Sequence, residues 1–200
     1  MNLFNRFLSI KLPPNTHERG YWIGDVSSDH FFDVGLAPAL VDFFKKESCS
    51  SIVDFGCGMG EYVKYLKASG LYCEGYDGNP NTPELSEGFA QVADLSVPLE
   101  LKRKFNWVLS LEVGEHIPKK YERIFIENLI KHCQSGIVLS WALKGQGGQG
   151  HFNERSNRYI KKVMKKHGLI NDVEAETFLR ENARANWLQN TIMVFRSANQ

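Results

Sequence analysis

The stretch VDFGCGMGEYVKYL, residues 53–66, decides the fold of this chain, because a β-rich run passes through a glycine-rich turn into a helical pattern. Gly56, Gly58 and Gly60 have no side chains, so the backbone can turn tightly there and approach a ligand closely. The order D-x-G-x-G-x-G differs from the G-x-G-x-x-G of dinucleotide sites, and no Lys-Ser/Thr ending of a P-loop follows. A structural bend would also use glycine, so the interpretation depends on the neighbouring segments.

Outward from this stretch, short β-rich runs alternate with helical patterns. Several of these runs are apolar on both faces, as buried parallel strands require. Strands that alternate with helices predict a doubly wound α/β sheet with right-handed crossovers. The runs are SIVDF (51–55), LYCEGY (71–76), FNWVLSL (105–111), GIVLSWA (136–142) and TIMVFR (191–196), and helical patterns cover 35–46, 121–133 and 159–167.

An aspartate follows the second run at the place where such sheets bind ligands. In a doubly wound sheet the ligand lies beyond the carboxyl ends of the strands, at the point where the strand order reverses. Asp77 stands just beyond the run 71–76, where a carboxylate can accept both ribose hydroxyls of a nucleoside. A turn-forming aspartate in YDGNP is the alternative. The glycine turn that precedes it favours the nucleoside.

With these motifs together, the chain resembles the class I S-adenosylmethionine-dependent methyltransferases over roughly residues 50–196. The resemblance implies a Rossmann-like α/β fold with a mostly parallel seven-stranded sheet in the order 3-2-1-4-5-7-6, an antiparallel last strand and helices on both faces. LQNTIMVFR, residues 188–196, suits that closing strand. We expect a helical, substrate-side segment over 1–48 and one S-adenosylmethionine-binding domain over 49–200.

The resemblance also implies a role for each donor-side residue. Asp54 and the turn 56–60 would cradle the methionine and ribose of S-adenosylmethionine, and Asp77 would take the ribose hydroxyls. Asp94 would lie beside the adenine amine with Leu95 as backbone partner, although a helix-cap or turn role for Asp94 stays open. The expected cofactor site comprises Asp54, Gly56, Cys57, Gly58, Gly60, Asp77, Gly78, Asp94, Leu95 and Leu111.

A polar cluster follows the run 105–111, which is expected to be the strand next to the first across the switch point. If the chain turns helical there, Glu112, Glu115 and His116 lie at i, i+3 and i+4 on one face. We expect these three residues to be catalytic, beside the sulfonium methyl group. Two carboxylates and an imidazole suit manganese, iron, cobalt or zinc better than magnesium. The spacing E-x-x-E-H is similar to that of the ubiquinone-pathway O-methyltransferases and the small-RNA 3′-terminal 2′-O-methyltransferases, which bind a divalent ion there.

Two interpretations of this cluster stay open, a metal site and a metal-free base. Metal-free relatives of the fold also carry Glu-His here, where it shapes the pocket or removes a proton. His151 is expected at the same edge of the sheet and would complete a metal set of Glu112, Glu115, His116 and His151; the alternative is a helix neighbour beside Asn153. The stretch SWALKGQGGQGHFNE, residues 140–154, is alternatively a flexible lid over the substrate, because its glycines can absorb closure.

Composition limits the partners and the compartment. Lys plus Arg number 24 and Asp plus Glu 23, so no global field points to nucleic acid or to a membrane surface. No long apolar run predicts a membrane span, and Asn5 and Arg6 interrupt the apolar positions of 1–12, which form a short amphipathic piece, a docking helix or tail, rather than a signal peptide. The 4 cysteines form no C-x-x-C pair, which favours reduced thiols in the cytoplasm.

The acceptor is the least determined part of the function. The segment 20–36 contains Trp22, His30, Phe31, Phe32 and Asp33, which either cap a pocket or pack on the sheet. The lysines of 161–166 are typical of a solvated face. A chain of 200 residues leaves little beyond a catalytic domain, which favours a small-molecule acceptor and, slightly, O-methylation over N-methylation. RNA 3′-terminal 2′-O-methylation and a non-catalytic S-adenosylmethionine-binding module stay as alternatives, and the oligomeric state is open.

Overall fold

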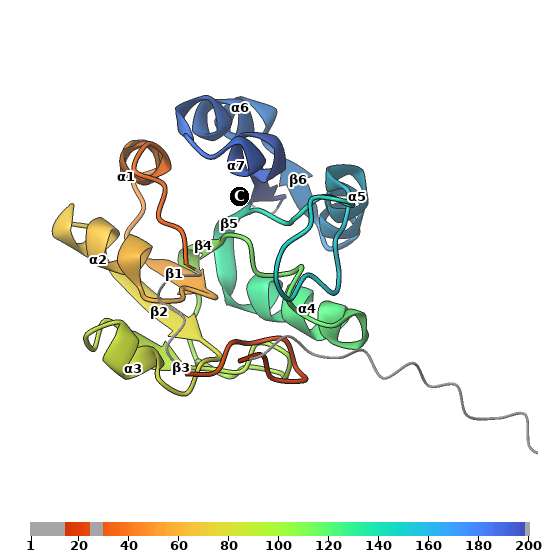
Figure 1. Ribbon diagram of the computed structural model, residues 1–200. Coiled ribbons are helices and arrows are strands. Elements are labelled where there is room, and N and C mark those ends of the chain that lie inside the picture. The colour runs from red at the N-terminus through yellow and green to blue at the C-terminus, as the bar shows by residue number, and fades with distance from the viewer. Residues whose placement is uncertain (1–14, 25–29, 199–200) are drawn as a thin grey trace, which may run out of the picture.

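Seven strands form one sheet in the order β3-β2-β1-β4-β5-β7-β6, as the computed structural model shows (Figure 1). The structure describes residues 15–24 and 30–198, so the amphipathic piece expected within 1–12 lies outside it. All neighbouring strands pair in parallel except at β7, which runs antiparallel to both β5 and β6. The predicted fold, strand order and antiparallel closing strand are therefore confirmed.

The elements follow one another as an α/β alternation. The strands are β1 Ile52–Phe55, β2 Cys73–Asp77, β3 Ala90–Val92, β4 Phe105–Ser110, β5 Cys133–Leu139, β6 Leu169–Asn171 and β7 Met193–Ser197. The helices are α1 Leu36–Lys46, α2 Glu61–Ala68, α3 Thr82–Leu85, α4 Glu122–His132, α5 Asn157–Lys166, α6 Val173–Asn182 and α7 Asn186–Thr191, with the 3-10 turn η2 Lys119–Tyr121 before α4. Sequence patterning had not identified β3 and β6.

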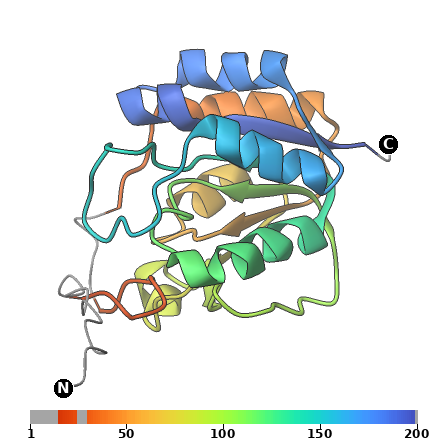
Figure 2. The same ribbon diagram turned by 90° about the vertical axis from the view of Figure 1, so that its right-hand side faces the viewer.

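Each face of the sheet packs against its own group of helices, and Figure 2 shows α1 and α6 on one side and α4 on the other. Successive side chains of β1 point to opposite faces of the sheet. Ile52 therefore packs in the cluster of α1, α2, α6 and α7, and Val53 packs in the cluster of α4 and α5. Both residues are 0% exposed. Burying a side chain of this size contributes roughly 1.5–3 kcal/mol, so two apolar layers stabilise the sheet that carries the strand ends.

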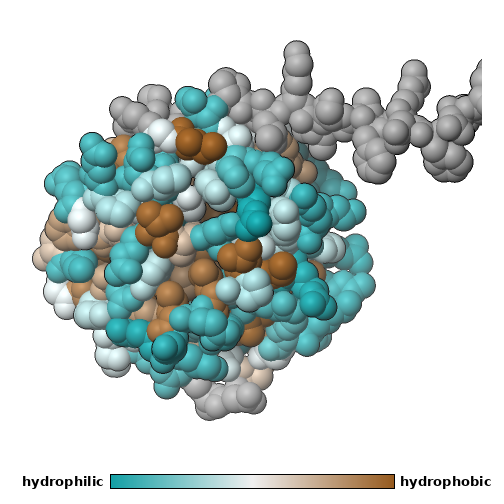
Figure 3. Space-filling view, turned by 90° about the horizontal axis from the view of Figure 1, so that it is seen from below, coloured by the Kyte–Doolittle hydropathy of each residue, from teal (hydrophilic) through white to brown (hydrophobic). Residues whose placement is uncertain are grey.

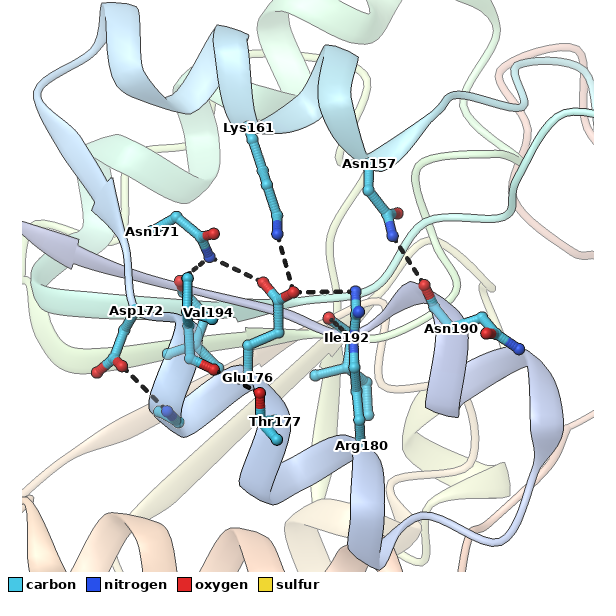
Figure 4. A network of polar contacts seen from close by, with 12 residues as sticks. Asn157, Lys161, Asn171, Asp172, Glu176, Thr177, Arg180, Asn190, Ile192 and Val194 are labelled. Atoms are coloured by element: carbon cyan, nitrogen blue, oxygen red, sulfur yellow. Dashed lines mark hydrogen bonds and ion pairs between the residues drawn. The ribbon is translucent and has the colours of Figure 1, made fainter.

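The far edge of the sheet is held by ion pairs (Figure 4). Glu176 on α6 is 5% exposed, and its carboxylate accepts hydrogen bonds from Lys161 Nζ at 2.8 Å and from Asn171 Nδ2 at 2.8 Å. Arg180 Nη2 lies 3.2 Å from the same carboxylate. Because these partners come from α5, β6 and α6, the short strand β6 is fixed from both sides.

Two further observations concern the exterior. The face seen in Figure 3 mixes polar and apolar side chains. Within 15–24 and 30–198, no helix is both long and apolar enough to cross a membrane.

Candidate active site

A cleft of about 610 Å³ opens where the strands β1, β2 and β4 end. Its lining joins segments that are far apart in the sequence, as expected for the switch point of a doubly wound sheet. Of the residues expected from the sequence, only Gly60 does not line it. The others line the cleft together: Asp54, Gly56, Cys57, Gly58, Asp77, Gly78, Asp94, Leu95, Leu111, Glu112, Glu115, His116 and His151.

The glycine turn after β1 requires glycine for two separate reasons. Gly56 and Gly58 have φ of 81° and 54°, a left-handed conformation that side chains rarely adopt. A Cβ on Gly56 would also lie 2.3 Å from Val113 Cγ2, and one on Gly58 would lie 2.6 Å from His30 Nδ1. Gly60 instead precedes α2 and faces Ser86. The turn is thus packed against the segment after β4.

Asp77, at the end of β2, is hydrogen-bonded to the glycine turn. Its Oδ2 accepts from the Gly58 N–H at 3.0 Å, and its Oδ1 accepts from the Asn79 N–H at 2.9 Å. Asp54 is 3% exposed, and burial, followed by the charge of Asp77, raises its pKa to about 8. Asp54 is therefore mainly protonated at neutral pH, whereas Asp77 presents a positioned carboxylate to the cleft.

Asp94 already has partners within the chain. Its Oδ2 pairs with Arg19 Nη1 at 2.8 Å, and its Oδ1 accepts from the backbone N–H of Ser96 at 2.8 Å and from the Ser96 hydroxyl at 2.6 Å. The turn role that the sequence left open is thus present. Leu95 is 4% exposed, and its carbonyl oxygen accepts a hydrogen bond from Asn128 Nδ2. A contact of Asp94 with adenine stays a prediction.

The segment 15–24 crosses the open side of the cleft. Gly20 lies so close to His116 that a Cβ there would be 2.0 Å from the His116 carbonyl oxygen. Tyr21 packs on Gly78, where an added Cβ would lie 2.5 Å from Tyr21 Cβ. The Trp22 ring stands edge-on to the His116 ring, with centroids 5.6 Å apart. This segment therefore contacts both Gly78, which follows β2, and His116, which follows β4.

Asp33, which was considered as a pocket residue, is instead a structural anchor. It is 0% exposed, and its carboxylate accepts four backbone N–H groups, from Gly35 and Leu36 at 2.9 Å and from Arg184 and Ala185 at 2.8 Å. Burial acts to raise its pKa, but these hydrogen bonds outweigh burial and lower the pKa. Asp33 joins the start of α1 to the loop before α7.

The segment after β4 is a turn, so the helical geometry expected for 112–116 is wrong. The His116 N–H donates to the Val113 carbonyl at 3.0 Å, and Glu112 has a left-handed φ of 53°. Gly114 lies against Trp141, where a Cβ would be 2.3 Å from the indole ring. This close packing and the left-handed residue replace the expected helix start, and the next helical residues begin at Lys119.

Glu115 and His116 of this turn come together with His151 of the loop after β5, whereas Glu112 is not part of this three-residue group. One ligand atom from each of the three lies within 4.8 Å of the others. The Glu112 carboxylate is turned toward other partners, accepting from Gln146 Nε2 at 3.1 Å and from Thr191 Oγ1 at 3.2 Å. The left-handed φ of Glu112 accounts for this difference from the expected set of four.

Burial determines the protonation of the cluster. Glu115 is 0% exposed, and neither of its oxygens has a hydrogen-bond partner in the described part of the chain. Burial, followed by the charge of Glu112, raises the pKa of Glu115 well above its usual range. Burial, followed by His151, lowers the pKa of His116 to about 4. Both pKa shifts favour the neutral form of the side chain, because a buried site stabilises a charge less well than water does.

The tautomer of His116 follows from its partner. His116 Nδ1 lies 3.2 Å from the Gly150 carbonyl oxygen, and a carbonyl can only accept, so Nδ1 carries the proton. Nε2 therefore keeps its lone pair at neutral pH. A lone pair at this position can accept a proton or bind a metal ion.

The glycine- and glutamine-rich loop is anchored at its base. Glu154 accepts hydrogen bonds from the backbone N–H groups of Gly145 and Gly147, both at 2.7 Å, and lies 3.3 Å from His151 Nδ1. The N–H groups of Phe152 and Asn153 donate to the Glu115 carbonyl at 2.8 and 2.9 Å. The exposed part, 144–149, thus extends from a fixed base beside the cluster.

Sequence reasoning missed the part of the cleft wall that α7 provides. Asn186, Trp187 and Leu188 line the cleft, and the Trp187 ring stands edge-on to Phe31 with centroids 5.1 Å apart. A usable signal did exist. Because β7 is antiparallel, the segment before it must lie at the edge where the parallel strands end, which places a tryptophan there beside the ligand.

Comparisons with known proteins agree with this geometry. The methyltransferase domain family matches residues 29–174. A tocopherol O-methyltransferase of the chloroplast from Arabidopsis thaliana is 30% identical over 118 residues, which cover 51% of this chain and 33% of that protein. This chain therefore spans about a third of the length of that relative.

Two solved structures share the fold at low sequence identity. Magnesium protoporphyrin IX methyltransferase from Synechocystis PCC 6803 with bound S-adenosylmethionine has a TM-score of 0.61 at 17% identity, covering 80% of this chain and 77% of that one. The sugar N-methyltransferase from Streptoalloteichus sp ATCC 53650 has a TM-score of 0.65 at 12% identity, covering 82% and 87%. At these identities the likeness concerns the fold.

Proposed function

The chain belongs to the methyltransferase domain family, and from this premise we propose that it transfers the methyl group of S-adenosylmethionine to a small-molecule acceptor bound in the cleft. The observation that carries the proposal is that the glycine turn with Asp77 lines the same cleft as the buried Glu115 and the half-buried His116. The first group suits the donor and the second suits proton management. An S-adenosylmethionine-bound structure of the same fold supports this choice of donor.

We assign donor binding to the ends of β1, β2 and β4. The backbone at Gly56, Cys57 and Gly58 would approach the methionine part, and Asp77 with Gly78 would face the ribose. Burial raises the pKa of Asp54 to about 8, and its carboxyl would lose its proton and become negative once the positively charged donor binds. Asp94, Leu95 and Leu111 complete the proposed wall.

In the transfer itself, a lone pair of the acceptor attacks the sulfonium methyl carbon in line. The new bond forms as the carbon–sulfur bond breaks, and its electron pair returns to sulfur, giving S-adenosylhomocysteine. The protein mainly aligns the two reactants. A hydroxyl acceptor must also lose its proton, which His116 Nε2 is free to accept. This free lone pair supports a slight preference for oxygen; an amine needs only an uncharged nitrogen.

A metal-assisted version uses the same residues differently. Glu115, His116 and His151 supply one oxygen and two nitrogen donors within 4.8 Å, and the two unpartnered oxygens of buried Glu115 fit a cation. These three residues would hold manganese, iron, cobalt or zinc. Such an ion would act as a Lewis acid and lower the pKa of an acceptor hydroxyl. Glu112 lies outside this ligand group.

The acceptor side would include the segment that precedes the sheet. Trp22, His30 and Phe31 line the cleft, which supports the proposal that 1–48 faces the substrate. Lys and Arg are absent from the lining within the described residues, which speaks against the alternative of RNA methylation. A cytoplasmic location stays a prediction; all 4 cysteines are free thiols.

The test is a screen of hydroxyl- and amine-bearing small molecules and of synthetic RNA with methyl-labelled S-adenosylmethionine, with and without a chelator. We expect transfer to small molecules. Activity that the chelator abolishes and added metal restores would select the metal version, and unchanged activity would select His116 as the base. A protein that binds S-adenosylhomocysteine but methylates no acceptor would contradict the proposed enzyme and favour a non-catalytic module.

A further inference from the structure

The charge of the cleft is strongly one-sided. Its described lining contains no Lys or Arg, and histidine is the only basic residue type present. An anionic acceptor would lose its hydration there without gaining a counter-ion, whereas a cation would gain one. The carboxyl groups that line the cleft are those of Asp54, Glu61, Asp77, Asp94, Glu112 and Glu115.

Two carboxylates of the proposed donor side, Asp77 and Asp94, have partners or a proposed ligand. Asp94 forms an ion pair with Arg19, and Asp77 accepts two backbone N–H groups while facing the proposed ribose. Glu112 differs from both. Its hydrogen-bond donors are the amide of Gln146 and the hydroxyl of Thr191, which are neutral, and its charge also acts on the neighbouring Glu115 carboxyl. No ion pair to Glu112 is found within 15–24 and 30–198. Its negative charge is therefore free to bind a cation.

Two aromatic residues, Phe31 and Trp187, line the same cleft as Glu112. Thr191, which donates toward Glu112 at 3.2 Å, also lies 2.8 Å from the carbonyl oxygen of Trp187, one turn earlier on α7. The Trp187 ring lines the cleft and contacts Phe31 edge-on. A carboxylate and aromatic rings that line one cleft are the groups that recognise an ammonium ion, through an ion pair and cation–π attraction.

A second, independent feature lies deeper in the same cleft. The Glu115 carboxyl is 0% exposed and lines the cleft, and both of its oxygens have no hydrogen-bond partner among the described residues. A buried polar group without a partner costs free energy unless a ligand supplies one. The acceptor end is thus incomplete without a donor of hydrogen bonds or positive charge.

We infer that the acceptor is a small molecule that carries an ammonium group, which binds Glu112 and the rings of Trp187 and Phe31 while its reactive group reaches His116. The inference rests on the proposed function and narrows its substrate class. It excludes phosphorylated and carboxylated acceptors.

Two matched series of probes test the charge preference. Tyramine, 4-ethylphenol and 4-hydroxyphenylacetate share a phenol and differ in charge, as do glucosamine, glucose and glucose 6-phosphate. Each is titrated calorimetrically into the protein saturated with S-adenosylhomocysteine. We expect the ammonium member of at least one series to bind roughly tenfold more tightly than the neutral member, as expected for a hydrogen-bonded charge, and the anion to bind most weakly.

The variant Glu112→Gln removes the charge and keeps the size and the polar contacts of the side chain. We expect it to abolish the preference for the ammonium member without changing the affinity for S-adenosylhomocysteine. The matched control is Glu181→Gln, an exposed carboxylate on α6 that does not line the cleft. This control should keep the preference.

The possible results separate the two proposals. Failure of every ammonium probe to bind, equal binding of neutral or anionic members, or an unchanged preference in Glu112→Gln would overturn the ammonium inference while leaving the proposed function intact. Failure of the wild-type protein to bind S-adenosylhomocysteine would overturn the proposed function and the inference with it.

Discussion

The two halves of the cleft differ in how their polar groups are satisfied. At the ends of β1 and β2, Asp77 accepts two backbone N–H groups, and nearby Asp94 is paired with Arg19. At the ends of β4 and β5, Glu115 is buried with two unpartnered oxygens, and His116 keeps a free Nε2. The polar groups of the proposed donor half are satisfied within the chain, whereas the proposed acceptor half holds polar groups that lack a partner.

This difference indicates a division of labour between binding and chemistry. A buried polar group without a partner costs about 1–3 kcal/mol, so its presence at one end of the cleft needs a reason. Proton transfer or cation binding at Glu115 and His116 supplies that reason. The positioned groups of the donor half instead bind a ligand with little reorganisation.

Replacing His116 should give the largest effect, because it should lower turnover without changing the binding of the donor product. His116→Ala removes the proposed proton acceptor, so we expect kcat to fall by about 10²–10⁴-fold with the affinity for S-adenosylhomocysteine kept within about twofold. Labelled methyl transfer and calorimetry measure the two quantities. His167→Ala, an exposed histidine at the end of α5, is the control and should leave both unchanged. Wild-type turnover in His116→Ala would remove this residue from the mechanism.

The donor half has a pH dependence of its own through Asp54. Its pKa is about 8 in the folded state, against an ordinary value of 3.8, so the folded state holds a proton that the unfolded state releases. Stability from this group is complete below pH 3.8 and is lost as the pH rises toward 8. Relative to Asp54→Asn, the wild-type protein should therefore lose about 3 kcal/mol of unfolding free energy between about pH 5.5 and 8.5.

Chemical denaturation of both proteins at the two pH values measures this change. His116, with its pKa lowered to about 4, has the opposite sign: its contribution is complete above pH 6.5 and is lost as the pH falls toward 4. Because His116 is present in both proteins, its contribution cancels in the comparison. A difference between the proteins that does not vary with pH would contradict the assignment of a buried, protonated Asp54.

Disturbing the glycine turn should weaken donor binding. Gly56→Ala adds left-handed strain and a Cβ 2.3 Å from Val113 Cγ2, and we expect about 100-fold weaker binding of S-adenosylmethionine, or roughly 2.7 kcal/mol. Gly70→Ala is the control, because Gly70 has a similar φ of 85° but no atom within 4 Å of an added Cβ.

A second substitution distinguishes the clash from the strain. Val113→Ala removes the methyl groups nearest to the added Cβ, so the double variant Gly56→Ala/Val113→Ala should recover part of the affinity. An affinity unchanged by Gly56→Ala would show that the turn does not hold the donor.

The fold and the donor half were predictable because their signals are local. The glycine spacing, the apolar runs and Asp77 after the second run each span only a few residues, and together they carry the family resemblance that implies the strand order, which the structure confirms. β3 and β6 were missed because each has only 3 residues. A strand of that length shows no period that can be separated from a loop.

The geometry of the proposed acceptor half could not be predicted, because it depends on tertiary contacts that the sequence spacing does not reveal. The spacing of Glu112, Glu115 and His116 suggested one helical face, but Gly114 packs against Trp141, and Glu112 takes a left-handed φ toward Gln146 and Thr191. Trp187 on α7 was overlooked for the same reason, since only the antiparallel course of β7 brings it to the cleft.

Calorimetric titration of the wild-type protein with S-adenosylhomocysteine, S-adenosylmethionine and NAD tests the central claim most directly. The claim is that the cleft at the ends of β1, β2 and β4 holds the methyl donor. We expect both sulfur ligands to bind with one site per chain, NAD to give no heat of binding, and His116→Ala to bind as the wild type does. Absence of binding by both sulfur ligands, or binding of NAD in their place, would contradict it.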